Sequence, residues 1–182
     1  MDFYSLFKFL HILTAIAWVG GGMTLLAADL IMSRSRGGNA PSPVLEIMNV
    51  LGKTWFVPTS FLTVITGAIT TTLGGMWGEL WVLLGLAGFA ATALTGMLLI
   101  EPTGQRIGAL LQAGQTGEAA AAGRRLMRIV RFDYVVMLVV IADMAIKPGW
   151  TDYGTLAVMA LTLAAGAIAL FAIGDRETAA AA

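Results

Sequence analysis

The sequence predicts an all-α protein, a polytopic membrane helical bundle with five transmembrane helices. Of the 182 residues, 58% are hydrophobic and 12% are charged, whereas a soluble domain carries roughly 25% charged residues. The mean hydropathy is +0.82, and several apolar runs match the roughly 30 Å hydrocarbon core of a bilayer. We therefore expect one integral membrane domain over residues 1–182, with the lipid bilayer as its solvent.

The composition also excludes several classes of function. Eleven basic and eleven acidic residues balance to zero net charge, and the basic residues are dispersed, so we expect no nucleic-acid partner. The chain has no cysteine and one histidine. These counts exclude disulfides and thiol catalysis, and they leave too few nitrogen and sulfur donors for a zinc site. No catalytic set of residues is apparent, so the sequence leaves open whether the protein is an enzyme.

The first helix is predicted over residues 6–32, and it contains the only histidine, His11. The twenty residues Phe9–Ala28 carry no formal charge, and as a helix they would be about 30 Å long. An ionisable group inside such a span is a functional candidate, because burying it without a partner is costly. Trp18 falls close to the same helical stripe as His11.

Glycine and proline divide the next part of the chain. They predict a loop over residues 33–53, in which Ser42 begins a short interfacial helix over residues 43–52. The second and third spanning helices are expected over residues 55–73 and 80–100, and Glu101–Pro102 is expected to end the third.

A polar connection over residues 101–128 leads into the fourth helix, predicted over residues 129–146. Its uncharged part is short and lies between Asp133 and Asp143, so this helix must pack inside the bundle rather than face lipid all round. The fifth helix is predicted over residues 153–174.

The basic residues orient these five spans. Nine of the eleven fall on one side, and the other side has only Lys8 and Lys147. The nine are Arg34, Arg36, Lys53, Arg106, Arg124, Arg125, Arg128, Arg131 and Arg176. Cytoplasmic loops carry the excess of Lys and Arg. We therefore expect the N-terminus outside and the C-terminus in the cytoplasm, with the chain in a bacterial inner membrane.

This topology places His11, Asp143 and Lys147 in the outer leaflet, where two interpretations stay open. In the functional one they form a buried polar site, with His11 as a proton acceptor or as a haem-iron ligand, the one metal role that its donor set favours. In the structural one, Asp143 and Lys147 form an i, i+4 ion pair and His11 bonds a neighbouring helix. A sixth haem ligand would come from a methionine or a second copy, or be absent.

Three short motifs carry a family resemblance. The run Lys8–Ile12 followed by Ile16–Gly21, then Pro58 with Leu62-Thr63 and Thr66-Gly67, and finally Ile141–Pro148 resemble helices of the HemJ-type protoporphyrinogen IX oxidases and of the copper-resistance D family. The chain is most similar to an uncharacterised family of bacterial predicted integral membrane proteins, over about residues 5–148.

The resemblance implies a compact bundle that holds b-type haem through the position of His11. In the oxidases a lysine on the third helix is important for activity, whereas residues 77–82 here contain no lysine and no histidine. The ligand is therefore carried over as an expectation, and the oxidation of protoporphyrinogen is not.

Two main hypotheses follow, from different classes. In the first, the protein is a small inner-membrane bundle that binds haem b or another redox group at His11, with Trp18, Asp143 and Lys147 as further cofactor-binding candidates. In the second, it is an accessory or structural subunit of a larger membrane complex, with no cofactor or catalysis of its own. A homodimer is a further expected assembly. A channel or transporter is less favoured, because the sequence has no internal repeat and no helix broken within the membrane.

Overall fold

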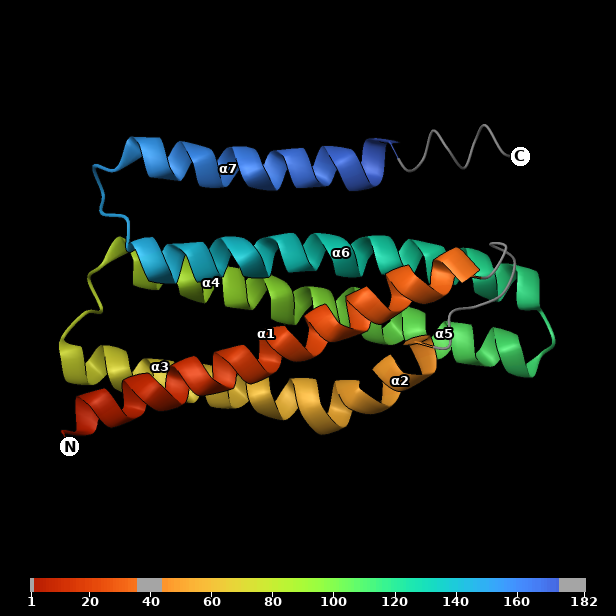
Figure 1. Ribbon diagram of the computed structural model, residues 1–182, viewed down its shortest axis with the longest axis horizontal. Coiled ribbons are helices and arrows are strands. Elements are labelled where there is room, and N and C mark those ends of the chain that lie inside the picture. Colours follow the sequence, from red (N-terminus) through yellow and green to blue (C-terminus); the bar gives the residue numbers. More distant parts are fainter. Residues whose placement is uncertain (1, 36–43, 174–182) are drawn as a thin grey trace. The chain divides into compact units, whose positions relative to one another are not determined.

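A computed structural model describes residues 2–35 and 44–173, which are helical apart from short turns (Figure 1). This confirms the predicted all-α class. The α-helices are α1 (Phe3–Ser35), α2 (Val44–Leu51), α3 (Val57–Gly74), α4 (Leu80–Thr95), α5 (Glu101–Gln112), α6 (Thr116–Ile146) and α7 (Tyr153–Ala167). Three π-helical segments accompany them, η1 (Gly52–Phe56), η2 (Gly96–Ile100) and η3 (Ile168–Ile173).

Four helical runs within the described residues are long and apolar enough to cross a membrane. They are Phe3–Met32, Gly52–Gly74, Leu80–Gln112 and Tyr153–Leu170. Helix α6 has 31 residues but is not among the four, and the charged residues along it account for the difference. The prediction of five spans therefore depends on whether α6 also crosses the membrane. With five crossings the two termini lie on opposite sides of the membrane, and with four they lie on the same side.

Three predicted helix boundaries are wrong. The fourth helix was expected to begin at residue 129, but α6 begins at Thr116. The other two boundaries each lie just before a proline. The helix that was expected to end at Glu101–Pro102 continues to Gln112, and no loop separates α2 from α3. In each case a π-helical segment that begins at glycine precedes the proline, η1 before Pro58 and η2 before Pro102. Proline clashes with the carbonyl of the residue four before it. The wider π turn changes the geometry at that carbonyl, so the helix continues.

The predicted loop over residues 33–53 is also shorter than expected. Helix α1 extends to Ser35, and the expected interfacial helix is present as α2, which begins at Val44. The first residue of the predicted interfacial helix and its cap Ser42 lie outside the described residues, as do Arg36 and the C-terminal segment 174–182 with Arg176.

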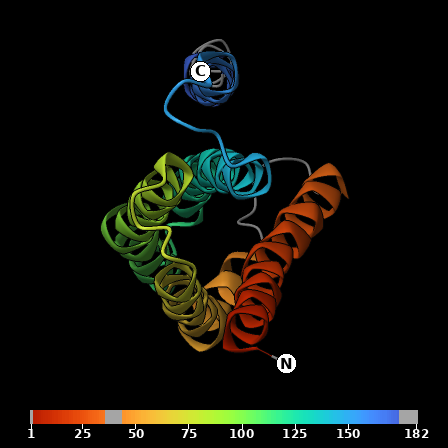
Figure 2. The same ribbon diagram turned by 90° about the vertical axis from the view of Figure 1, so that its left-hand side faces the viewer.

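The chain divides into two compact units, which we describe separately. The first comprises Met1–Gly78 and Gly104–Gly123. In it, α1 and α3 run antiparallel, side by side (Figures 1 and 2). At the end of α3, Gly75 adopts a left-handed φ of 65°, which glycine adopts without strain.

The second unit comprises Glu79–Thr103 and Arg124–Ala182. Helices α4 and α6 run antiparallel within it (Figure 1), and small residues of α4 face α6. A Cβ at Gly88 would meet the side chain of Val140, and one at Gly85 would meet that of Met144. Such small residues let two membrane helices approach closely. On its other side α6 contacts α7, where Gly166 lies against Val135.

Candidate functional site

His11 lies on α1 in the first unit, partly buried against α3. Its Nδ1 is 2.8 Å from the backbone carbonyl oxygen of Thr63. A carbonyl can only accept, so Nδ1 carries the proton and donates it. The structural interpretation expected His11 to bond a neighbouring helix, and the structure places this bond at Thr63.

Gly67 gives the imidazole its access to that carbonyl. A Cβ at Gly67 would lie 2.8 Å from Cε1 and 2.9 Å from Nδ1 of His11. In an α-helix each Cβ tilts toward the N-terminus, over the turn that precedes it. A side chain at position 67 would therefore cover the carbonyl of residue 63, and glycine leaves it open to the ring.

Trp55 makes the reciprocal contact from the other helix of the pair. Its Nε1 donates to the carbonyl oxygen of Ala17 at 3.1 Å, and a Cβ at Gly21 would lie 2.8 Å from the same Nε1. In both contacts the glycine follows the accepting carbonyl by four residues. The antiparallel helices are thus joined by two ring N–H groups, each seated on a glycine of the opposite helix.

His11 differs from Trp55 in having a second ring nitrogen. With the proton on Nδ1, the neutral imidazole presents Nε2 as an acceptor. No hydrogen bond to Nε2 is found among the described residues. A backbone carbonyl that holds Nδ1–H is also the arrangement that orients metal-ligating histidines. The donor chemistry at His11 therefore fits one axial ligand of a haem iron.

Trp18 lies on the same helix as His11, two turns further on, and is partly buried. The other two cofactor-binding candidates, Asp143 and Lys147, belong to the second unit. The expectation that these four residues form one site therefore stays a prediction.

The expected ion pair between Asp143 and Lys147 is wrong. The backbone N–H of Lys147 donates to the backbone carbonyl of Asp143 at 2.7 Å, which ends the helix. Lys147 then adopts a left-handed φ of 54°, and its Nζ lies 4.9 Å from the centroid of the Trp81 ring. The change of backbone direction takes the ammonium group away from the carboxyl group and onto an aromatic face, where cations are attracted.

Asp143 is buried and has no partner. Its side chain is 1% exposed, and neither carboxyl oxygen makes a hydrogen bond among the described residues. Gly85 of α4 lies beside it: a Cβ there would be 3.7 Å from Oδ2, in ordinary van der Waals contact, although the Met144 methyl group lies closer to the same point. An unpartnered buried carboxyl group is rare in proteins, so it requires a specific explanation.

A second aspartate of α6 shows the ordinary solution. Asp133 is 7% exposed, and a side-chain hydrogen bond joins it to Thr92 of α4. Gly85 precedes Thr92 by seven residues, two turns along α4, so both residues point toward α6. Asp133 thus lies opposite the hydroxyl donor of Thr92, whereas Asp143 lies beside Gly85, which has no side-chain donor.

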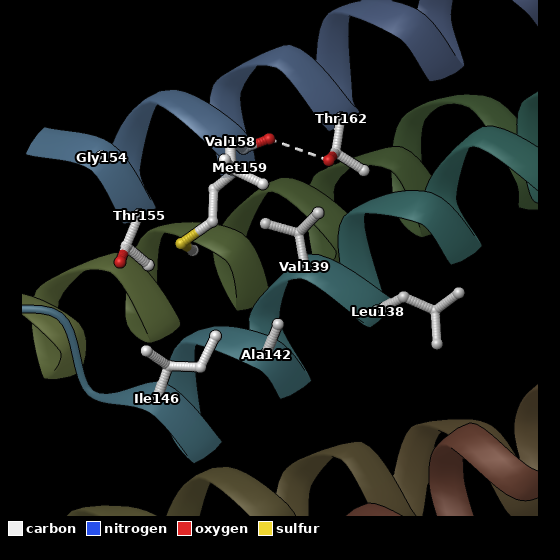
Figure 3. Close-up of a pocket in the computed structure, with 9 residues that line it drawn as sticks. All are labelled: Leu138, Val139, Ala142, Ile146, Gly154, Thr155, Val158, Met159 and Thr162. Atoms are coloured by element: carbon white, nitrogen blue, oxygen red, sulfur yellow. Dashed lines mark hydrogen bonds between the residues drawn. The ribbon is translucent and has the colours of Figure 1, made fainter.

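The second unit also contains an open apolar cleft of about 460 Å³ between α6 and α7 (Figure 3). Val139 of α6 and Met159 of α7 point into the space between the two helices. The hydroxyl of Thr162 is satisfied within α7, since it donates to the carbonyl of Val158 at 2.8 Å. None of the predicted site residues lines this cleft, and the lining offers no charged group.

Sequence reasoning missed the roles of Thr63, Gly67 and Gly85. The first two belong to a stripe of small residues on α3, which the spacing explains as helix packing alone. Only the neighbouring helix shows which glycine faces a ring or a carboxyl group. Within residues 2–35 and 44–173, no group of three or more His, Asp or Glu side chains gathers as a metal site would require.

Comparison with known protein families matches residues 5–148 to a family described as predicted integral membrane protein (DUF2269). No curated protein and no solved structure matches the chain. The expected relation to the HemJ-type oxidases and to the copper-resistance D family thus receives no support from the comparisons.

Proposed function

Since this chain belongs to the DUF2269 family and is a multi-pass integral membrane protein, we propose that it binds haem b or another small redox group through Nε2 of His11. The observation that carries the proposal is the bond from Nδ1 of His11 to the carbonyl of Thr63. This bond fixes both the tautomer and the orientation of the ring, and it leaves Nε2 as the acceptor.

The chain would hold the group through a single nitrogen, without a cluster of ligands. Gly67 and the Thr63 carbonyl hold the imidazole on its α3 face, so the ring cannot rotate to present Nδ1 instead. Bound haem would supply one-electron chemistry. Trp18, on the same helix, is the proposed neighbour of the group within the first unit.

The proposal includes a topology of five spans in a bacterial inner membrane, with the N-terminus outside. The absence of native cysteine makes the test direct. Single cysteines at Ser5 and at Gln112 should react with an impermeant thiol reagent from opposite sides of the membrane. A cysteine at Asp152 should react from the same side as Ser5 if α6 spans. Reaction of Asp152→Cys from the side of Gln112→Cys would overturn the five-span topology.

One observation favours a second candidate function, an accessory subunit of a larger membrane complex or a homodimer. The apolar span of α7 has no buried residue. A helix that is apolar all round and leaves every residue at least partly exposed requires lipid or a partner helix around it. Stable co-purification with other membrane proteins, lost when residues 153–173 are replaced by an unrelated apolar helix, would support this candidate.

An absorption spectrum of the gently solubilised protein, oxidised and dithionite-reduced, tests the haem proposal. We expect a Soret band in the wild type that is lost in His11→Asn. The asparagine amide can still donate to the Thr63 carbonyl, so this variant removes Nε2 and keeps the contact between the helices.

Trp55→Phe is the matched control, because it removes the equivalent ring bond to Ala17 without changing His11. It should retain the Soret band. A wild type that stays colourless after purification and after incubation with haemin, or a band that persists in His11→Asn, would contradict the proposal.

A further inference from the structure

The carboxyl group of Asp143 poses a question that the haem proposal does not answer. It is 1% exposed, has no hydrogen-bond partner in the described part of the chain, and lies one turn before the end of α6 at Ile146. Burying an isolated carboxylate costs far more than burying a neutral polar group. The group must therefore find a counter-charge or a donor, or give up its charge.

Among the described residues of the second unit, no counter-charge reaches this carboxyl group. The charged residues at this end of α4 and α6 are Glu79, Lys147 and Asp152, and all three are exposed. Lys147 lies over Trp81, and Asp152 accepts from the backbone N–H of Gly149 at 2.7 Å. Glu79 carries the same charge as an ionised Asp143.

The backbone of the helices around Asp143 also cannot supply a donor. Each backbone N–H in a helix interior is already used in the helix, whereas each carbonyl oxygen retains a second lone pair. A helix surface can therefore accept a hydrogen bond but cannot give one. A carboxylate is an acceptor only, but a protonated carboxylic acid has an O–H that a carbonyl can accept.

We propose that Asp143 is a proton-binding site of this membrane protein, which the folded chain holds as a neutral carboxylic acid. The burial of both oxygens, the contact of Oδ2 with Gly85 rather than with a polar side chain, and the position of the Lys147 ammonium over Trp81 support this assignment. The site is independent of the proposed haem ligand, because it uses no residue of the first unit. A change of charge close to Asp143 would change the proton affinity of this carboxyl group, so the group would then take up or release one proton.

Infrared spectroscopy of the purified chain in phosphatidylcholine vesicles tests the proposal directly. The carbonyl stretch of a protonated carboxyl group should be present in the wild type and lost in Asp143→Asn. The control Asp152→Asn, which alters an exposed and hydrogen-bonded carboxylate, should leave that band unchanged. Loss of carboxylate bands in Asp143→Asn, with no loss of the carboxylic acid band, would overturn the proposal.

A second measurement uses the unaltered chain, so it does not depend on the folding of a variant. A membrane-soluble carbodiimide reacts with carboxylic acids. The carboxyl oxygen bonds to the central carbon of the reagent while the acid proton moves to a reagent nitrogen, and the adduct rearranges to a stable N-acylurea. Peptide mass spectrometry should find the label on Asp143 and not on Asp152. Label on Asp152 alone would contradict the proposal.

Discussion

His11 in the first unit and Asp143 in the second are both ionisable groups on apolar helices, and both face a glycine of the opposite helix. The imidazole makes a bond of 2.8 Å to a backbone carbonyl, whereas the carboxyl group has no hydrogen-bond partner among residues 2–35 and 44–173. The difference follows from donor and acceptor chemistry. A glycine exposes a carbonyl that can accept another bond, but it exposes no free N–H.

The same rule accounts for the other polar side chains of the two units. Trp55 donates to the Ala17 carbonyl across the helix pair, and the buried Thr63, Thr66 and Thr70 donate to carbonyls of their own helix. Asp133, an acceptor, has its bond with the Thr92 side chain instead. Membrane helices thus satisfy donors through their backbone and require side chains to satisfy acceptors.

The largest effect is expected for Gly67→Ala, which tests the glycine seat of His11. The new Cβ would stand within 2.9 Å of two ring atoms, and overpacking of this kind costs about 1–3 kcal/mol. Thermal unfolding in detergent should show a lower midpoint. The control Gly20→Ala meets nothing within 4 Å and should be neutral or stabilising by roughly 0.5–1 kcal/mol, since glycine weakens a helix interior. If the two substitutions change the unfolding midpoint equally, Gly67 is not needed for the contact between His11 and α3.

A smaller loss is expected for Trp55→Phe, the other ring contact of the first unit. The phenyl ring keeps most of the apolar contact with Gly21 but has no N–H for the Ala17 carbonyl. The lost hydrogen bond is worth about 1 kcal/mol. Urea unfolding monitored by circular dichroism measures the change. No change in stability would show that this bond contributes nothing to the pairing of α1 with α3.

In the second unit, Lys147→Met should lose about 0.5–1 kcal/mol, because the attraction between the ammonium group and the Trp81 ring disappears. Lys147→Gly should lose less, since glycine relieves the left-handed φ of 54°. The thermal unfolding midpoints of the wild type and the two variants measure these losses of stability. If Lys147→Met is as stable as the wild type, the contact with Trp81 contributes nothing, and if Lys147→Met is more stable than Lys147→Gly, glycine relieves no strain at this position.

The smallest effect concerns Asp2, which precedes α1 and is exposed. Its Oδ1 accepts from the backbone N–H of Ser5 at 2.6 Å, and this bond lowers the pKa of the Asp2 carboxyl group below its ordinary value of 3.8. The cap therefore stabilises the first turn above pH 3.8, and this contribution is lost as the pH falls through the lower folded-state pKa. Hydrogen exchange at the Ser5 amide should accelerate on acidification more than the intrinsic rate does. Asp2→Asn, which caps without titrating, should abolish that excess.

The sequence predicted the helical class and most helix positions, because apolar run length is a local property. It failed at Pro102, which was expected to end the third helix, because a preceding π turn keeps the helix continuous. It failed again at Asp143 and Lys147. Their i, i+4 spacing predicts a pair on an unbroken helix, whereas the chain turns at Lys147 and Trp81 competes for the ammonium group.

The sequence by itself determined that lipid surrounds this chain and that His11 is its single imidazole, because composition and residue type require no neighbour. Only the tertiary structure decided which ring nitrogen of His11 is occupied and which aspartate lacks a donor. Both outcomes depend on the residue that a second helix presents at one position, Gly67 for the ring and Gly85 for the carboxyl group. Spacing along one helix carries no information about that choice.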